Sequence, residues 1–240
     1  MSHFRLRSFG FLKLDGSMEG DELRDFSGVC RLFPLPGVVL FPHAVLPLHI
    51  FEPRYRQMTE DALAGDRLVT MVQLRSGEES ASEIEDVGCL GRILQHERLP
   101  DGRYNFLLLG CKRVRLRREL PSGKLYRVAE AEILEDNPSE RGEGSGRREL
   151  VRLFRDVLER SESFDADLRS FLESDLPLGV LTDILAHALG VDSEWKQSLL
   201  AETRVDRRVD ELLDILRLAV ARDPATEGMS RDFPPPFSSN

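Results

Sequence analysis

The stretch LFPLPGVVLFPHAVLPLHIFEPRY, from Leu32 to Tyr55, decides how the first half of this chain folds. Proline fixes the backbone angle φ and has no N–H, so five prolines in so short a stretch exclude one continuous helix. The apolar side chains between them are too numerous to remain in water. The stretch therefore predicts short strands and turns that form the first wall of a β-rich core. Its prolines are Pro34, Pro36, Pro42, Pro47 and Pro53.

The composition is that of a globular protein with an uneven charge distribution. Hydrophobic residues make up 41% of the 240 residues and charged residues 31%, so the chain can bury one large core or two modest ones. The formal net charge is −9, which disfavours nonspecific nucleic-acid binding by the chain as a whole. Between Leu90 and Arg127, however, ten Lys or Arg residues stand against three acids, a local balance of +7.

The cysteines and the apolar runs indicate the compartment. Cys30, Cys89 and Cys111 show no paired spacing, which predicts neither a disulfide framework nor a zinc site. Basic residues interrupt every apolar run near the N-terminus, and no window approaches the roughly 20 apolar residues of a membrane span. We therefore expect a cytoplasmic protein with free thiols and no membrane partner.

Strand and turn patterns alternate through the first half of the chain. One helix is predicted from Glu52-Pro53 to Gly65, because an acid followed by proline often begins a helix and apolar residues then recur at helical spacing. The turn sequence Pro100-Asp101-Gly102 predicts a hairpin. These short strands with a single helix favour an antiparallel β-barrel. The predicted strands cover residues 28–35, 38–41, 45–51, 67–74, 87–94, 103–110, 112–120 and 125–134.

The apolar period becomes helical after residue 148. The preceding segment is rich in Gly, Ser and charge, which predicts a linker and not a dinucleotide-binding loop, since no strand leads into its glycines. Amphipathic helices with short connections then predict a helical bundle. The predicted units are a flexible arm (1–27), the barrel (28–135), the linker (136–148), the bundle (149–221) and a disordered tail (222–240).

These residues resemble a known family. The stretch from Leu32 to Tyr55 resembles the start of the Lon-protease N-terminal (Lon substrate-binding) domain, as found in small stand-alone proteins of that kind. The segment from Leu176 to Leu216 resembles the helical part of the same domain. The resemblance implies an α+β fold: an N-terminal PUA-like antiparallel β-barrel with one helix, followed by a C-terminal helical bundle.

The resemblance also implies a protein-binding module and not an enzyme. In full-length Lon this region helps to recognise unfolded or tagged substrate proteins, and the ATPase and protease parts follow it. This sequence contains no GxxxxGK[ST] phosphate loop, and we expect no Ser-Lys protease region after the helices. The spacing of His43, His49 and Glu52 matches no known ligand cluster. We therefore expect no catalytic residue, cofactor or metal, and an adaptor that passes unfolded or apolar polypeptide segments to a protease or chaperone.

The proline-rich stretch is the candidate peptide site. Prolines hold backbone in an extended form whose edge can accept a polypeptide strand, and nearby aromatic rings would contact its apolar side chains. A place in the core is the alternative for these rings: we expect it for Phe51 and leave both possibilities open for Phe41 and Tyr55. The candidate peptide-binding residues are Phe41, Pro42, His43, Arg54 and Tyr55.

A basic strand face supports an alternative function. Strand alternation places Arg113, Arg115 and Arg117 on one outward face of the predicted strand 112–120. PUA-like folds can bind RNA, and such a face would contact phosphates through its charge. A solvated face, or a contact with the acidic helical part, is the competing interpretation. RNA binding by these three arginines is therefore the alternative hypothesis, and nucleic acid is the less expected partner.

Overall fold

The structure is a computed structural model that describes residue 23 and residues 26–75, 83–144, 146–160, 172 and 174–221. Almost all of the predicted arm and the whole of the predicted tail lie outside the described residues. The description therefore covers the predicted barrel, linker and bundle, with gaps in the loop after residue 75 and between residues 160 and 174.

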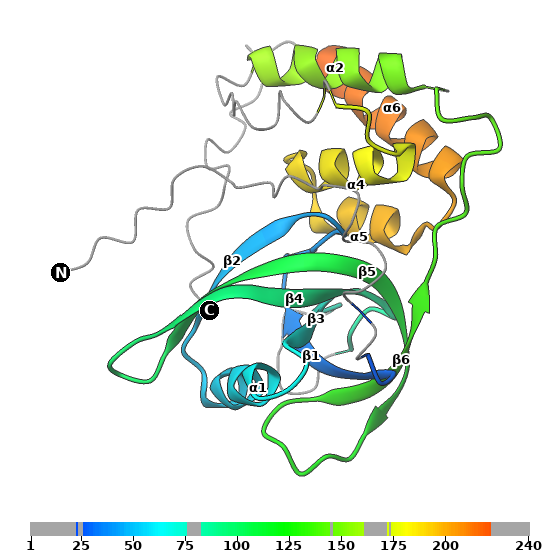
Figure 1. The fold of residues 1–240 in the computed structure, drawn as a ribbon. Helices are drawn as coiled ribbons and strands as arrows, with labels where there is room; N and C mark the ends of the chain where they lie inside the picture. The colour runs from blue at the N-terminus through cyan, green and yellow to red at the C-terminus, as the bar shows by residue number, and fades with distance from the viewer. Residues whose placement is uncertain are drawn as a thin grey trace.

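Six strands form one sheet at places that the patterns predict (Figure 1). The predicted strands 103–110 and 112–120 merge into one strand, because a register shift lets the pairing continue past Cys111, the residue between them. Residues 38–41 form no strand. The strands are β1 (Val29–Leu35), β2 (Val45–Ile50), β3 (Leu68–Gln73), β4 (Val87–Arg98), β5 (Tyr104–Leu120) and β6 (Val128–Leu134).

The strands pair in the order β2-β5-β4-β3-β1-β6, and β6 also pairs with β5. Strands β5, β4, β3, β1 and β6 therefore form a closed ring of pairings. β1 and β3 run parallel, with Leu32 opposite Thr70, so the prediction of a purely antiparallel sheet is wrong at this pair. The chain passes through β2 and the helix α1 (Pro53–Leu63) before β3, and a crossover of that length returns it in the same direction.

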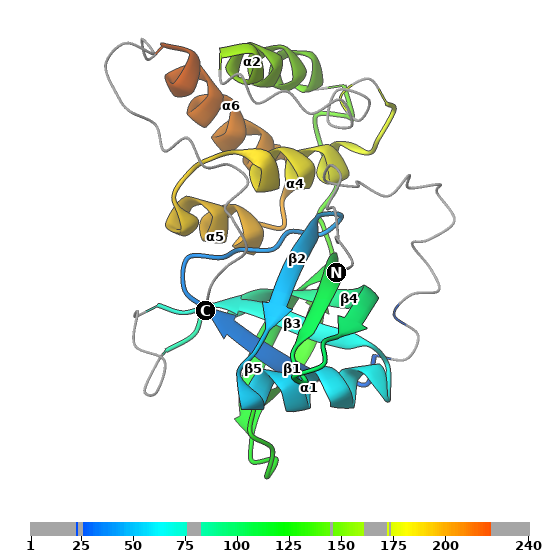
Figure 2. The ribbon, with the colours of Figure 1, turned by 90° about the vertical axis from the view of Figure 1, so that its left-hand side faces the viewer.

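The helices lie on two sides of the sheet (Figure 2). Helix α1 lies at one end, and the other four described helices gather at the opposite side, with α4 and α5 nearest the strands. α1 begins at Pro53, as the sequence predicts, and buries Tyr55, Met58 and Ala62. The four remaining helices are α2 (Arg147–Arg160), α4 (Leu178–Ala188), α5 (Ser193–Ala201) and α6 (Val205–Ala221).

One hydrophobic core joins the sheet to the helices. The same cluster of buried side chains contains Phe33 and Ile93 from the strands and Ile184 and Leu216 from the helices. Burying a side chain of this size stabilises the fold by about 1.5–3 kcal/mol. Because the two parts bury apolar surface against each other, the core fixes the position of the helices over the sheet.

The predicted linker, residues 136–148, is held against α6. Ser139 Oγ donates a hydrogen bond to Asp206 at 2.6 Å. Arg141 donates two hydrogen bonds to Asp210, at 2.7 and 2.8 Å. Composition alone does not reveal such contacts, because the partners lie some 70 residues further along the chain.

Candidate functional site

A cleft of about 200 Å³ lies between the sheet and the helices. One wall comes from the loop before β2 and from β5, and the other comes from the N-terminal turn of α4 and the segment after β6. A cleft at a boundary between two parts of a fold is a common place for a binding site. Its lining residues are Pro42, His43, Cys111, Lys112, Arg113, Leu134, Glu135, Asp136, Pro138, Glu143, Pro177, Gly179, Val180, Asp183 and Val205.

The loop before β2 enters the cleft because it lies against a glycine of β5. The backbone N–H of His43 donates to Gly110 O at 2.8 Å. A Cβ on Gly110 would lie 2.0 Å from Phe41 O, so only glycine permits this approach. His43 has φ 66°, a left-handed conformation that is uncommon for residues other than glycine. The approach places Pro42 and His43 at the cleft.

A buried ion network, made of Arg113, Asp136, Asp183 and Arg208, borders the cleft, and its first three members line it. Arg113 on β5 donates to both carboxylate oxygens of Asp183 on α4, one of them at 2.9 Å. Arg113 Nε donates to Leu200 O at 2.9 Å, and its Nη1 donates to Asp136 at 3.3 Å. The side chains of Arg113 and Asp183 are each 2% exposed. The network therefore joins the sheet to α4 and α5.

Arg208 on α6 completes the network from the other side. It donates to the two oxygens of Asp136 at 2.8 and 2.5 Å, and its Nε donates to Thr182 Oγ1 at 3.0 Å. Burial alone would raise the pKa of Asp136, but the hydrogen bond from Arg208 and the charges of Arg113 and Arg208 outweigh it. The pKa of Asp136 consequently lies below its usual range.

The far wall is the N-terminal turn of α4. The backbone N–H of Leu178 donates to Glu143 Oε2 at 2.6 Å, so this carboxylate caps the helix where the dipole favours a negative charge. A Cβ on Gly179 would lie 2.8 Å from Asp136 Oδ2. The missing side chain at this position therefore lets α4 approach the buried ion network.

The five candidate peptide-binding residues lie in three environments. Phe41 is fully buried, and Tyr55 is 4% exposed with its hydroxyl donating to Pro34 O at 3.1 Å. Pro42 and His43 line the cleft. Arg54 lines a separate hollow of about 30 Å³ beside Tyr55, too small for more than a water molecule.

The aromatic assignment from the sequence is wrong for one residue. Phe51, which we expected in the core, is 38% exposed, whereas Phe41 and Tyr55 are buried. Phe51 comes just after the last residue of β2, where the chain turns into α1 and leaves the surface that the helices cover. Its ring lies 6.1 Å from that of His49, in a stacked arrangement on the outside.

The predicted basic face is divided by burial. Arg113 is covered by the helices and paired in the buried ion network, so the prediction of an exposed position is wrong for this residue. Arg115 and Arg117 are about half exposed, and both pair with Glu132 on the neighbouring strand β6. A phosphate would therefore have to compete with a carboxylate at each exposed arginine.

The network residues Asp183 and Arg208 were not selected from the sequence, although one signal was present. Arg208 follows Val205 by three residues and precedes Leu212 by four, so it occupies a position on the apolar stripe of α6. A charged residue on such a stripe requires a buried partner of opposite charge. Sequence periodicity identifies the need, but it does not identify Asp136 and Asp183 as the partners.

Two negative findings concern the described residues alone. Among them, no three His, Cys, Asp or Glu side chains are grouped so as to hold a metal ion. None of their helices combines the length and the apolar character needed to cross a bilayer.

Curated relatives share the sequence over most of this chain. Lon protease 2 of Myxococcus xanthus is 28% identical over 198 residues, which make up 80% of this chain and 24% of that protein. The chain spans about a quarter of the length of the curated relatives it matches.

Two solved structures share the fold. The Lon N-terminal domain protein from Xanthomonas campestris has a TM-score of 0.60 at 24% identity and covers 78% of this chain and 97% of its own. The N-terminal domain of the Mycobacterium avium complex Lon protease has a TM-score of 0.65 at 16% identity and covers 79% and 98%. A family model of the ATP-dependent protease La (LON) substrate-binding domain matches residues 29–217. The chain therefore belongs to the LON substrate-binding domain family.

Proposed function

We propose that this chain is a non-catalytic module that recognises polypeptide substrates and acts as an adaptor for a protease or chaperone. Membership of the LON substrate-binding domain family motivates the proposal. The observation that carries it is the cleft between sheet and helices, because two residues nominated from the sequence, Pro42 and His43, line it.

The same family suggests finer names for the two parts of the fold. The closed ring of strand pairings supports a PUA-like barrel over residues 28–135. The packing of the helices over residues 149–221 supports a helical bundle. In this view the cleft is the groove between barrel and bundle.

An unfolded, apolar segment is the expected occupant. The cleft has apolar side chains on both walls: Pro42 before β2 on one wall, and Pro138 after β6 and Val180 on α4 on the other. A folded protein seldom offers a side chain that can enter a cleft of about 200 Å³, whereas an unfolded segment does. Apolar contacts give such an encounter its affinity and little sequence specificity.

Fluorescence anisotropy with a labelled apolar peptide that carries no charged side chain tests the proposal. We expect saturable binding by the wild-type protein. Pro138→Asp places a charge at the exposed rim of the cleft and should weaken binding roughly fivefold. Pro100→Asp, at the exposed tip of the β4–β5 hairpin, is the matched control and should bind like wild type. No binding of any apolar peptide or denatured protein by the wild-type chain would refute the proposal.

A further inference from the structure

The charges of the cleft are nearly balanced. Four carboxylates line it, those of Glu135, Asp136, Glu143 and Asp183. The two aspartates are balanced by Arg113 and Arg208 within the buried ion network. Glu135 is balanced by Lys112, whose Nζ donates to it at 2.9 Å.

Glu143 carries the remaining formal charge. Its Oε2 accepts the backbone N–H of Leu178, a neutral donor, at 2.6 Å. Among the described residues, Lys112 and Arg113 in the lining and Arg208 behind it stand against four lining carboxylates, which leaves one formal negative charge at the cleft. The N-terminus of α4, the part of the cleft that would attract an anion, is already occupied by the same carboxylate. A cationic group is the better electrostatic match.

The remaining lining suits the stem of a long cationic side chain. Val180 and Val205 come from the helices, Leu134 is the last residue of β6, and Pro138 lies in the segment that follows it. Lys and Arg side chains lay their methylene groups along apolar surface and keep the charged head near a polar partner. The cleft volume of about 200 Å³ accommodates one side chain of this length and not a folded surface.

We infer that the cleft takes the side chain of a Lys or Arg residue from an otherwise apolar polypeptide segment, with Glu143 as the carboxylate that the cation faces. This inference rests on the proposed function and adds to it a preference for segments that contain a basic residue. The bound segment would contain one basic residue with apolar neighbours. A segment with an acidic residue at the position of the basic one would be repelled by the charge of Glu143 and would not bind.

Two matched peptides test the inference on the full chain. They share one apolar sequence and differ only at the central position, which is lysine in one and norleucine in the other. Norleucine keeps the aliphatic stem and lacks the charge. By fluorescence anisotropy at low salt, we expect the lysine peptide to bind roughly fivefold more tightly than the norleucine peptide. The advantage should shrink as the salt concentration rises.

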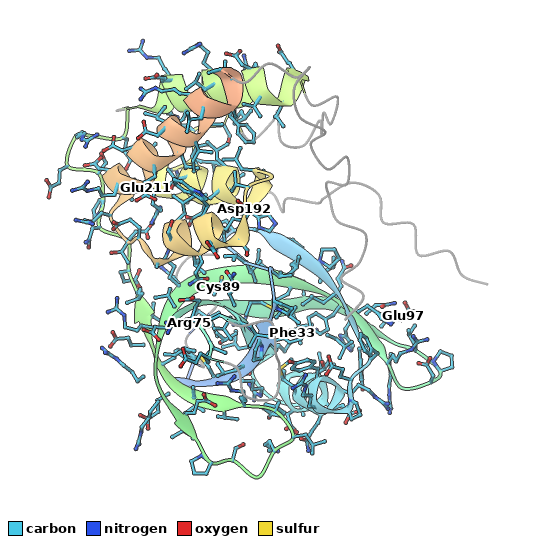
Figure 3. The ribbon with its side chains drawn as sticks, turned by 180° about the vertical axis from the view of Figure 1, so that it is seen from behind. Phe33, Arg75, Cys89, Glu97, Asp192 and Glu211 are labelled. Carbon is cyan, nitrogen blue, oxygen red and sulfur yellow. The ribbon has the colours of Figure 1, made fainter. Side chains whose placement is uncertain are left out.

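Glu143→Gln removes the charge and retains a carbonyl oxygen that can accept the N–H of Leu178. This variant should abolish the advantage of lysine, so that it binds the two peptides with equal affinity. Glu97→Gln is the matched control, because Glu97 is exposed at the hairpin end of β4, far from α4 and the helices packed beside it (Figure 3). The Glu97→Gln variant should still bind the lysine peptide more tightly than the norleucine peptide.

The outcomes separate the two proposals. Equal affinity for both peptides would overturn the preference for a basic side chain and leave polypeptide binding in place. If both Glu143→Gln and Glu97→Gln still bind the lysine peptide more tightly, the basic side chain binds away from Glu143. That result would also overturn the inference. If neither peptide binds, the proposed function is overturned together with this inference.

Discussion

Arg113 and Arg115 lie two residues apart on β5 and share one face of the sheet, yet they belong to different regions of the molecule. The helices cover Arg113, whose side chain is 2% exposed and paired with Asp183. Arg115 lies beyond that cover, is 45% exposed, and pairs with Glu132 at 3.8 Å. Arginine at the same position of the strand pattern thus links the sheet to the helices where the helices cover it. Beyond that cover it faces solvent.

The difference teaches that the contribution of a strand arginine to stability depends on whether the helices cover it. An exposed ion pair contributes about 0–1 kcal/mol, because water and salt screen it. Removing one partner of a buried pair costs about 3–5 kcal/mol, because the other charge remains without water. Figure 3 shows the position of this boundary: Cys89, which faces Arg113 across the β4–β5 pairing, lies close beneath the helices.

Arg113→Leu should give the largest effect. It leaves Asp183 buried with Arg208 Nε at 3.7 Å as its remaining cation in the network, so we expect the free energy of unfolding to fall by about 3–5 kcal/mol. Urea denaturation measures the loss. Arg115→Leu is the matched control and should change stability by about 0.5 kcal/mol or less. Equal losses in the two variants would contradict the comparison.

A second test uses a histidine of the same interface. His187 on α4 is half-buried, with its ring nitrogen Nδ1 out of contact with solvent and its ring 6.4 Å from that of Phe41. Desolvation of the ring, with the nearby charge of Lys196, lowers the pKa of His187 from 6.5 to about 3. Below pH 6.5 the unfolded chain therefore binds a proton that the folded chain does not, and stability falls until the pH reaches about 3.

At pH 4 this single group should remove about 3 kcal/mol of the stability present at neutral pH. Urea denaturation at both pH values measures the change. His187→Leu removes the group, so its loss of stability on acidification should be smaller than that of wild type by this amount. An identical pH dependence in the two proteins would show that His187 does not carry the effect.

Gly179→Ala should produce an intermediate effect on the buried region. The added methyl would lie 2.8 Å from Asp136 Oδ2 and 3.2 Å from Arg208 Nη2, which forces the network or α4 to shift. We expect thermal or urea denaturation to show a loss of about 1–2 kcal/mol, despite the better helix propensity of alanine. Gly144→Ala, with nothing within 4 Å of the new methyl, is the control. Full stability in Gly179→Ala would mean that the network adjusts freely.

The smallest effect concerns the exposed region. A double-mutant cycle on Arg117 and Glu132 should give a coupling energy of about 0–1 kcal/mol that decreases with added salt. The same cycle on Arg113 and Asp183 should give a larger coupling that salt hardly changes. Similar values for the two cycles would remove the distinction between the regions.

Local signals predicted many elements of the fold. The prolines of the opening stretch limited its strands, Glu52-Pro53 marked the start of α1, and the turn at Pro100-Asp101-Gly102 joins β4 to β5. Such signals succeed because a φ restriction or a missing N–H acts within a few residues. Parallel pairing of β1 with β3 has no comparable signal, since the direction of return depends on the whole segment between them.

The candidate site was predicted in part. Pro42 and His43 were selected for their place beside extended backbone, and both line the cleft. Phe51 was expected in the core and is exposed, whereas Phe41, for which both possibilities were open, is buried, because burial depends on which surface the helices cover. Glu143 was overlooked, since it lies in a segment that composition identified as a linker.

The sequence by itself determined the family, the positions of most strands, the start of α1 and the presence of a basic strand. These follow from local backbone restrictions and from side-chain periodicity. Only the tertiary structure decided that Arg113 is buried while Arg115 is exposed, and that Asp136, Asp183 and Arg208 form one ion network with Arg113. The physical reason is that the charge pairs join residues about 70 positions apart and the core joins residues still further apart, which come together only when the helices pack on the sheet.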